Sequence, residues 1–192
     1  IALRAGVAMA ADGQARAGMG TDAGDYNGDG RLDLFVTNHE LEAHTLFHNL
    51  GGGLFEDATS RSGVGLATLP YVGFGTVFFD YDHDADLDLA IVNGHVMNDP
   101  GHFRPGASEA QRKLLLRNDG GRFTDVGRTA GPGFATEKLG RGLAAGDIDN
   151  DGDLDLLVIN NGGTADLLRN DNPAGPGSIL LHLVGTTSNR DA

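Results

Sequence analysis

Short apolar runs separated by turn residues recur along the whole chain. One set begins with residues 73–79, continues after an acidic loop with residues 87–92, and ends with residues 113–116 and 122–126. Short runs of this kind, bounded by Gly, Asn and Asp, are typical of β-strands. Helical periodicity is hard to find, and residues 108–113 would make one or two turns at most. The pattern therefore predicts an all-β fold.

The acidic loop occurs three times, and an apolar run follows it each time. The loops begin at Asp25, Asp80 and Asp147. The flanking segments repeat as well, with Arg4-Ala-Gly6, Arg61-Ser-Gly63 and Arg128-Thr-Ala-Gly131 upstream and a Leu-x-x-Asn segment downstream. About four short strands per repeat are the signature of β-propeller blades. Three blades leave open sheet edges, so we expect a partial β-propeller that belongs to a larger one.

The repeats also predict where the units begin and end. We expect the end of a preceding blade or a linker in residues 1–20, followed by one blade with one acidic loop in each of residues 21–66, 67–133 and 134–176. The chain begins at Ile1 without a charged-then-apolar leader, so no signal peptide is expected within it. It is predicted to be a mature or excised segment.

Each acidic loop places oxygen ligands on alternate residues, which lets them converge on one cation. Calcium takes about six to eight hard oxygen ligands, whereas magnesium prefers to keep its waters. We therefore predict about three Ca²⁺ ions per chain. The predicted ligands are Asp25, Asn27, Asp29, the backbone oxygen of Arg31 and Asp33; Asp80, Asp82, Asp84, the backbone oxygen of Asp86 and Asp88; and Asp147, Asp149, Asp151, the backbone oxygen of Asp153 and Asp155. The alternative is that these aspartates only end strands and fill turns.

These loops differ from the helix-loop-helix calcium site known as the EF-hand. An EF-hand has a bidentate Glu at position 12 of its loop. Here position 12 is Val36, Ile91 or Val158, inside the following apolar run, and an Asp stands at position 9 instead. The loops are therefore predicted to be strand-loop-strand sites, in which bound calcium stabilises the fold.

The second loop carries Ala85 where the other two carry Gly30 and Gly152. If this position needs a positive φ, alanine costs about 1 kcal/mol or more. A weaker or reshaped second site is expected for that reason. The first loop has Asn27 in place of a carboxylate, which gives it one negative charge fewer than the others.

Charge and composition narrow the partners. Asp and Glu number 27 against 14 Lys and Arg, so the net charge is -13 and the surface repels phosphate. Nucleic acid and anionic membranes are therefore poor partners, and no apolar run approaches the roughly 18 residues of a membrane span. The absence of cysteine excludes disulfides, thiolate zinc sites and cysteine nucleophiles.

The chain shows no sequence motif for catalysis. No Gly-x-Ser-x-Gly elbow, phosphate loop or dinucleotide fingerprint occurs, so no enzyme is predicted. The insertion at residues 93–112 contains His95, Asp99 and His102, for which a second metal site or an acid/base pair is the alternative to a solvated loop. His83, at position 4 of the second loop, is expected to point outwards, and we expect His39, His44 and His48 at a blade edge.

The repeats resemble FG-GAP/VCBS repeats of the integrin-α-type β-propeller. The resemblance rests on Gly73-Phe-Gly75 before the second loop and on Asp-x-Asp-x-Asp-Gly-x-x-Asp-Leu within the loops. Asn93-Gly-His95-Val96, Gly140-Arg-Gly142 and the segment 178–192 are similar to the cartilage acidic protein family and its bacterial relatives. In that family an ASPIC/UnbV domain follows the repeats, so residues 177–192 are expected to begin such a domain.

This resemblance implies a seven-bladed propeller, of which the chain holds about three blades. It also implies export, calcium loading at the loop positions named above, and a role in adhesion or in binding a protein or glycan. Two alternatives stay open, namely the non-catalytic part of a calcium-dependent secreted polysaccharide-acting enzyme and a purely architectural spacer. An extracellular, cell-surface or bacterial periplasmic location follows from calcium as well, because cytosolic calcium is too low to fill sites of modest affinity.

Overall fold

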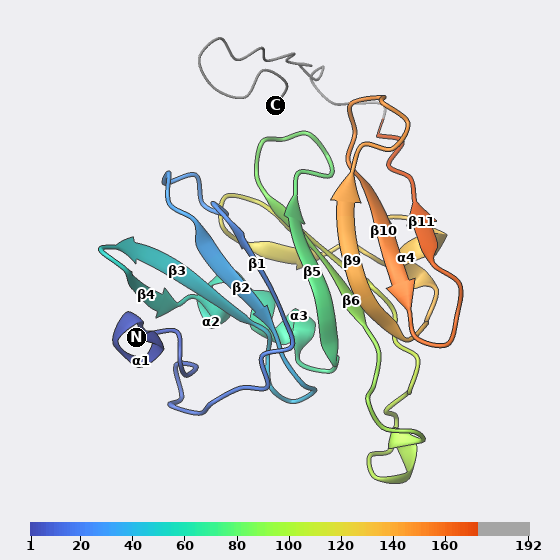
Figure 1. The fold of residues 1–192 in the computed structure, drawn as a ribbon, viewed down its shortest axis with the longest axis horizontal. Helices are drawn as coiled ribbons and strands as arrows, with labels where there is room; N and C mark the ends of the chain where they lie inside the picture. The colour runs from blue at the N-terminus through green and yellow to red at the C-terminus, as the bar shows by residue number, and fades with distance from the viewer. Residues whose placement is uncertain (173–192) are drawn as a thin grey trace, which may run out of the picture.

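Three antiparallel β-sheets, one for each sequence repeat, form the computed structural model, which describes residues 1–172 (Figure 1). The first sheet has the order β1 (Gly20–Gly24), β2 (Asp33–Thr37), β3 (Thr45–Gly51) and β4 (Leu54–Asp57). The second has β5 (Gly73–Phe79), β6 (Asp88–Asn93), β7 (Leu114–Asn118) and β8 (Phe123–Asp125). The third has β9 (Gly140–Gly146), β10 (Asp155–Asn160) and β11 (Asp166–Leu168).

Helices are short and lie in the connections. They are α1 (Ala2–Ala5), α2 (Thr59–Ser62), α3 (Val64–Thr68), the 3₁₀ turn η1 (Pro100–His102) and α4 (Pro132–Ala135). Residues 108–113 do not form the one or two helical turns that the sequence allowed. They are partly extended, with β-bridges from Ala110 to Gly94 and from Gln111 to Lys138. Within residues 1–172, no helix is long and apolar enough to cross a membrane.

The first strands of the three sheets lie side by side, because glycine lets their backbones approach closely (Figure 1). A Cβ on Gly20 of β1 would lie 2.0 Å from the carbonyl oxygen of Phe74 in β5. A Cβ on Gly75 of β5 would lie 2.6 Å from the amide nitrogen of Leu143 in β9. No larger residue fits at either position without a backbone shift.

Strand β6 lies between two hydrophobic cores, and all six of its residues are buried. Leu89 and Ile91 pack in the core shared with the first sheet, whereas Ala90 packs against the third sheet with Leu156. Side chains that alternate between two faces of a strand explain this division. The near-continuous apolar run of β6 is therefore the mark of a sheet covered on both sides.

The all-β class and the blade-like repeats are confirmed, as a fold consistent with part of a β-propeller. Two features differ from a complete propeller of four-stranded blades. The third sheet has three strands among the described residues, and the three described sheets do not close into a ring. The expected boundaries between units stay a prediction, and the expected start of an ASPIC/UnbV domain at residues 177–192 lies outside the described residues.

The acidic loops occupy the same place in every sheet. Each joins the first strand to the second, so all three lie at one end of the sheets, at the top of Figure 1. The insertion between β6 and β7, which includes η1, projects from the opposite end. The fold thus separates the candidate metal loops from the longest exposed loop.

Candidate metal centre

The three acidic loops share one backbone conformation, which is held by main-chain amides that donate to aspartate side chains. The first aspartate accepts from the amide five residues later, in the pairs Asp25–Gly30 (2.7 Å), Asp80–Ala85 (3.0 Å) and Asp147–Gly152 (3.1 Å). The fifth residue accepts from the amide two residues later, in the pairs Asp29–Arg31 (3.0 Å), Asp84–Asp86 (2.9 Å) and Asp151–Asp153 (3.0 Å). These bonds curl each loop, which directs its alternate side chains inward.

The aspartate at position 9 anchors each loop to the sheet. Asp33, Asp88 and Asp155 are almost fully buried. One carboxylate oxygen accepts from the amide at position 2 of the same loop, and the other accepts from an asparagine amide on the third-strand side, namely Asn49, Asn118 or Asn170. The repeated spacing of these residues is thus explained by bonds that tie each loop to its second strand and to the end of its third.

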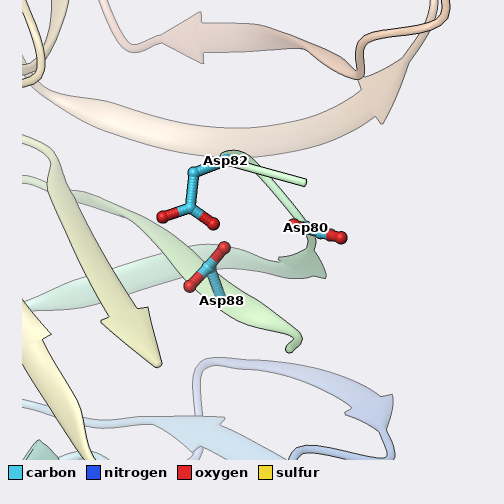
Figure 2. A group of neighbouring side chains, drawn as sticks. All are labelled: Asp80, Asp82 and Asp88. Atoms are coloured by element: carbon cyan, nitrogen blue, oxygen red, sulfur yellow. The ribbon is translucent and has the colours of Figure 1, made fainter. Parts of the chain in front are cut away.

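Two loops bring three carboxylates together. Asp80, Asp82 and Asp88 each offer an oxygen within 4.8 Å of the others, and Figure 2 shows Asp82 and Asp88 pointing toward one another with Asp80 beside them. In the third loop the group consists of Asp147, Asp149 and Asp151, at positions 1, 3 and 5, and all three are exposed. In the second loop, Oδ1 of Asp82 is buried without a hydrogen-bond partner among the described residues. This oxygen is a candidate cation ligand.

Burial and mutual repulsion disfavour the charged form of these carboxylates. Burial raises the pKa of Asp88 to about 7, and Asp82 and Asp84 add to the rise. Burial also raises the pKa of Asp82, as do its neighbours Asp84 and Asp80. Asp149 shows the same direction of pKa shift, from desolvation and from Asp151. A bound divalent cation would reverse this electrostatic balance.

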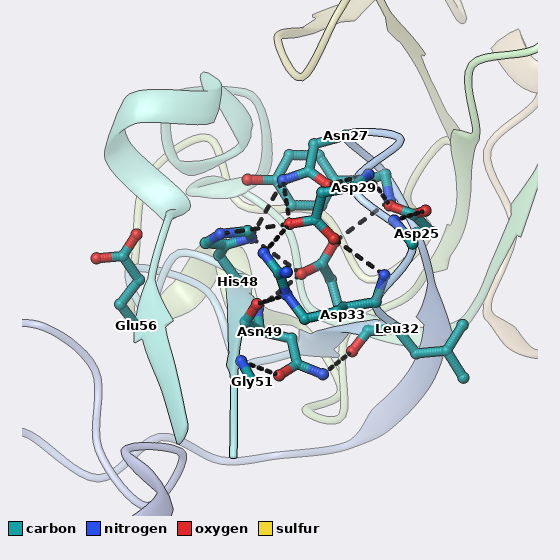
Figure 3. Close-up of polar contacts among 12 residues, drawn as sticks. Asp25, Asn27, Asp29, Leu32, Asp33, His48, Asn49, Gly51 and Glu56 are labelled. Atoms are coloured by element: carbon teal, nitrogen blue, oxygen red, sulfur yellow. Dashed lines mark hydrogen bonds and ion pairs between the residues drawn. The ribbon is translucent and has the colours of Figure 1, made fainter. Parts of the chain in front are cut away.

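The first loop contains cationic and amide side chains in addition to its carboxylates (Figure 3). The Arg31 guanidinium pairs with Asp29 at 2.5 Å, and Nδ1 of His48 lies 3.1 Å from Asp33. The position that corresponds to Asp82 is Asn27. The three-carboxylate groups found among the described residues are those of the second and third loops, so the first loop is the least negative of the three.

His83 connects two acidic loops, and the expectation that it points outwards was wrong. Its Nε2 atom lies 2.9 Å from Oδ1 of Asp153 in the third loop, and its side chain is mostly buried. The cause is tertiary, because the close packing of β5 and β9 brings the second and third loops together. Sequence reasoning also missed His48, although the aligned Leu-x-x-Asn segments place Arg117 and Arg169 at the same position of the other units.

The three polar residues of the insertion do not form one site. His95 is buried, and its Nε2 lies 3.2 Å from Oε1 of Glu40, which also pairs with Arg104 at 2.5 Å. Asp99 and His102 are exposed, and neither joins His95 in an acidic or histidine cluster among residues 1–172. The contacts of His95 instead tie the insertion to the loop between β2 and β3.

The donor sets of the loops fit calcium better than other common cations. They consist of carboxylate, amide and carbonyl oxygens, which Ca²⁺ prefers, and the described clusters contain no nitrogen or sulfur ligand of the kind that zinc takes. The structure brings together three of the predicted carboxylates in each of the second and third loops, and the full ligand sets stay a prediction. The roles of the backbone oxygens of Arg31, Asp86 and Asp153 stay predictions.

Ala85 has the left-handed conformation that the sequence comparison anticipated. Its φ is 73°, beside 83° at Gly30 and 96° at Gly152. Replacing Ala85 by glycine is expected to raise the free energy of unfolding by about 1 kcal/mol, because glycine adopts positive φ without steric strain. Urea unfolding in saturating calcium measures this effect. The reverse change, Gly30→Ala, is the matched control and is expected to destabilise; a less stable Ala85→Gly variant would contradict the argument.

Comparison with known proteins places these features in a family. The profile of the FG-GAP-like repeat matches residues 25–91 and 106–158, and that of the FG-GAP repeat matches residues 139–180. Cartilage acidic protein 1 of Mus musculus is 31% identical over 161 residues, and its Homo sapiens counterpart is 29% identical over 163 residues. Both alignments cover 83% of this chain, which spans 22% of the length of either relative.

One solved structure that matches the chain comes from a study of recognition of non-reducing terminal N-acetylglucosamine by an Agrocybe aegerita lectin. Its TM-score is 0.36 at 17% identity, with 79% of this chain and 38% of that chain covered. The family assignment rests on the repeat profiles, which match more than half of the chain and include all three acidic loops. The chain therefore belongs to the FG-GAP-like repeat family.

Proposed function

We propose that this chain is a calcium-stabilised module of an extracellular β-propeller that binds a protein or carbohydrate partner. The convergence of carboxylates in the second and third loops is the observation that carries the proposal. Two further observations support it. Oδ1 of Asp82 is buried without a hydrogen-bond partner among the described residues, so a cation could take that place. The pKa of Asp88 is raised because its negative charge is uncompensated, and a bound cation would compensate it.

Calcium would act through the fold. The ligands would be the predicted oxygens at positions 1, 3, 5, 7 and 9 of each loop, and position 9 already joins the loop to neighbouring strands. Binding at 100 times the dissociation constant stabilises the native state by about 2.7 kcal/mol per site. Without a cation, repulsion between the clustered carboxylates favours separation of the loop residues.

Outside the cell, the calcium concentration is high enough to fill sites of modest affinity. Extracellular calcium modules work with dissociation constants of about 10⁻⁴ to 10⁻³ M, which cytosolic calcium does not reach. The net charge of -13 also attracts cations to the chain. The family supports a non-catalytic repeat module.

The insertion between β6 and β7 is the proposed partner-binding region. It is anchored by the pairs that Glu40 makes with His95 and Arg104, and Arg141 donates to the carbonyl oxygens of Gly94 and His95. Phe103 near its tip is 72% exposed. A large apolar side chain on an anchored loop is suited to recognition, because little conformational entropy is lost on binding.

Arrays of glycans and extracellular proteins test this function. We expect the chain to retain a ligand in calcium and to release it in EGTA, and we expect Phe103→Ala to weaken retention at least tenfold. Leu66→Ala, which truncates another exposed apolar side chain, is the control and is expected to bind normally. Equal retention of the ligand in calcium and in EGTA would contradict the calcium dependence. Cleavage of a polysaccharide on the array would favour the enzyme alternative.

A further inference from the structure

Adjacent repeats are joined at their acidic loops by an asparagine side chain. Nδ2 of Asn118 donates to the carbonyl oxygen of Tyr26 in the first loop at 2.7 Å, and Nδ2 of Asn170 donates to that of Tyr81 in the second loop at 2.9 Å. The main-chain amides of the same two asparagines donate to the position 9 aspartates of their own repeats. Each asparagine thus connects the loop of its own repeat with the loop of the repeat before it.

The second and third loops share one further contact, which the first and second loops lack among the described residues. Nε2 of His83 lies 2.9 Å from Oδ1 of Asp153, and the two side chains are 17% and 16% exposed. Position 4 of the first loop is Gly28, which has no side chain to make such a contact. The His83–Asp153 contact therefore distinguishes the two pairs of neighbouring loops, although both pairs have the asparagine bond.

The backbone at position 4 does not require a histidine. The φ angle is 70° at Gly28, 62° at His83 and 61° at Asn150, so all three residues have the left-handed conformation. Glycine adopts this conformation without strain, and asparagine is common in it. Histidine therefore adds a contact with another loop at a position that glycine or asparagine also fills.

The contact joins residues that carry or flank predicted ligands in both loops. His83 lies between Asp82 and Asp84 in the chain, and the backbone oxygen of Asp153 is the predicted ligand at position 7 of the third loop. Ordering of the second loop around a cation would hold His83 in place, and His83 would in turn hold Asp153. Because the entropy of ordering this shared contact is lost once for two ions, filling of one loop favours filling of the other.

We propose that His83 couples calcium binding in the second and third loops, so that occupancy of either loop raises the affinity of the other. The inference rests on the proposed calcium function and adds a positioning residue to it. No coupling of this size is expected between the first and second loops, which are joined by the asparagine bond alone. The first loop is therefore an internal reference for the other two.

A double-mutant cycle, followed by a calcium titration that resolves the individual loops, tests the coupling. Asp149→Asn/Asp151→Asn disables the third loop and keeps its side-chain oxygens. These changes remove two negative charges, as many as a bound Ca²⁺ would neutralise, so the empty variant loop matches the filled parent loop in net charge. Nuclear magnetic resonance of the amides of Ala85 and Gly30, which donate to the first aspartates of their loops, reports filling of the second and first loops.

In the chain with His83, disabling the third loop is expected to raise the calcium midpoint at the Ala85 amide by about fivefold or more. In His83→Asn, which copies Asn150 of the third loop, the same change is expected to be about twofold at most, the limit for independent sites. The midpoint at Gly30 is the control and is expected to change by about twofold at most in both backgrounds. Asp153→Ala removes the other side of the contact and is expected to abolish the coupling as well.

Two kinds of failure are distinguishable. An equal shift of the Ala85 midpoint with and without the His83→Asn change would overturn the proposal and leave the calcium function intact, as would no shift in the chain with His83. An Ala85 amide that does not respond to calcium at all would overturn the calcium function and the coupling together.

Discussion

Replacing Asp82 by asparagine is expected to change stability in opposite directions with and without calcium. In EGTA the variant is expected to be more stable than the parent chain, because it removes a charge that burial and the neighbouring Asp80 and Asp84 disfavour. In calcium it is expected to be less stable, because a charged carboxylate ligand is replaced by a neutral amide oxygen, as at Asn27 of the first loop, and this oxygen holds the cation less strongly. The loss reaches about 2.7 kcal/mol if the parent site is filled at 100 times its dissociation constant and the variant site stays empty.

Urea unfolding in both conditions measures this reversal. Asp99→Asn is the matched control, because it removes the same charge from an exposed residue on the insertion, where asparagine also tolerates the positive φ of 52°. The control is expected to show no calcium-dependent change relative to the parent chain. An Asp82→Asn variant with the same change in stability in both conditions would show that Asp82 does not bind the cation.

His44 is expected to lower the stability of the chain when the pH falls from 7 to 5, against the opposite contribution of Asp88, whose raised pKa lets the folded chain take up a proton before the unfolded chain does. The His44 side chain is fully buried, and burial lowers its pKa from 6.5 to about 3, which Asn93 offsets only in part. The unfolded state therefore takes up a proton below pH 6.5 that the folded state refuses until about pH 3. The stability that neutral His44 preserves is complete above pH 6.5 and falls by about 1.4 kcal/mol per pH unit below it, or about 2 kcal/mol at pH 5.

His44→Gln tests the assignment of this pH dependence. The amide of Asn38 donates to Nδ1 of His44 at 3.1 Å, and a glutamine oxygen is a possible replacement for that acceptor. The variant is expected to lose stability at pH 7 and to lose about 2 kcal/mol less than the parent chain between pH 7 and pH 5. His102→Gln, on the exposed insertion, is the control. An unchanged pH dependence in His44→Gln would assign the effect to other groups.

The sequence predicted the parts of the fold that local patterns encode. Apolar runs bounded by turn residues marked the strands, and the repeated aspartates marked loops that the structure holds in one conformation. The need for positive φ at Ala85 also followed from alignment of the repeats, because Gly30 and Gly152 occupy the same place. A repeat provides internal comparisons, and these replace much of the information that a single sequence lacks.

Contacts between repeats were not predictable in the same way. His83 meets Asp153 across two loops that are 70 residues apart, and nothing in the local pattern of either loop indicates the other. His44 is buried with Phe35 and Gly73 beside its ring, and the contact with Gly73 of the second sheet is not encoded by the local pattern.

A calcium titration followed by thermal unfolding tests the central claim most directly. The whole chain is melted in EGTA, in increasing calcium and in equal magnesium, and isothermal titration gives the number of ions bound. We predict a rise in melting temperature that is larger in calcium than in magnesium, with one ion for each of the three acidic loops. No rise, or the same rise in magnesium, would contradict the account and would leave the loops as acidic turns.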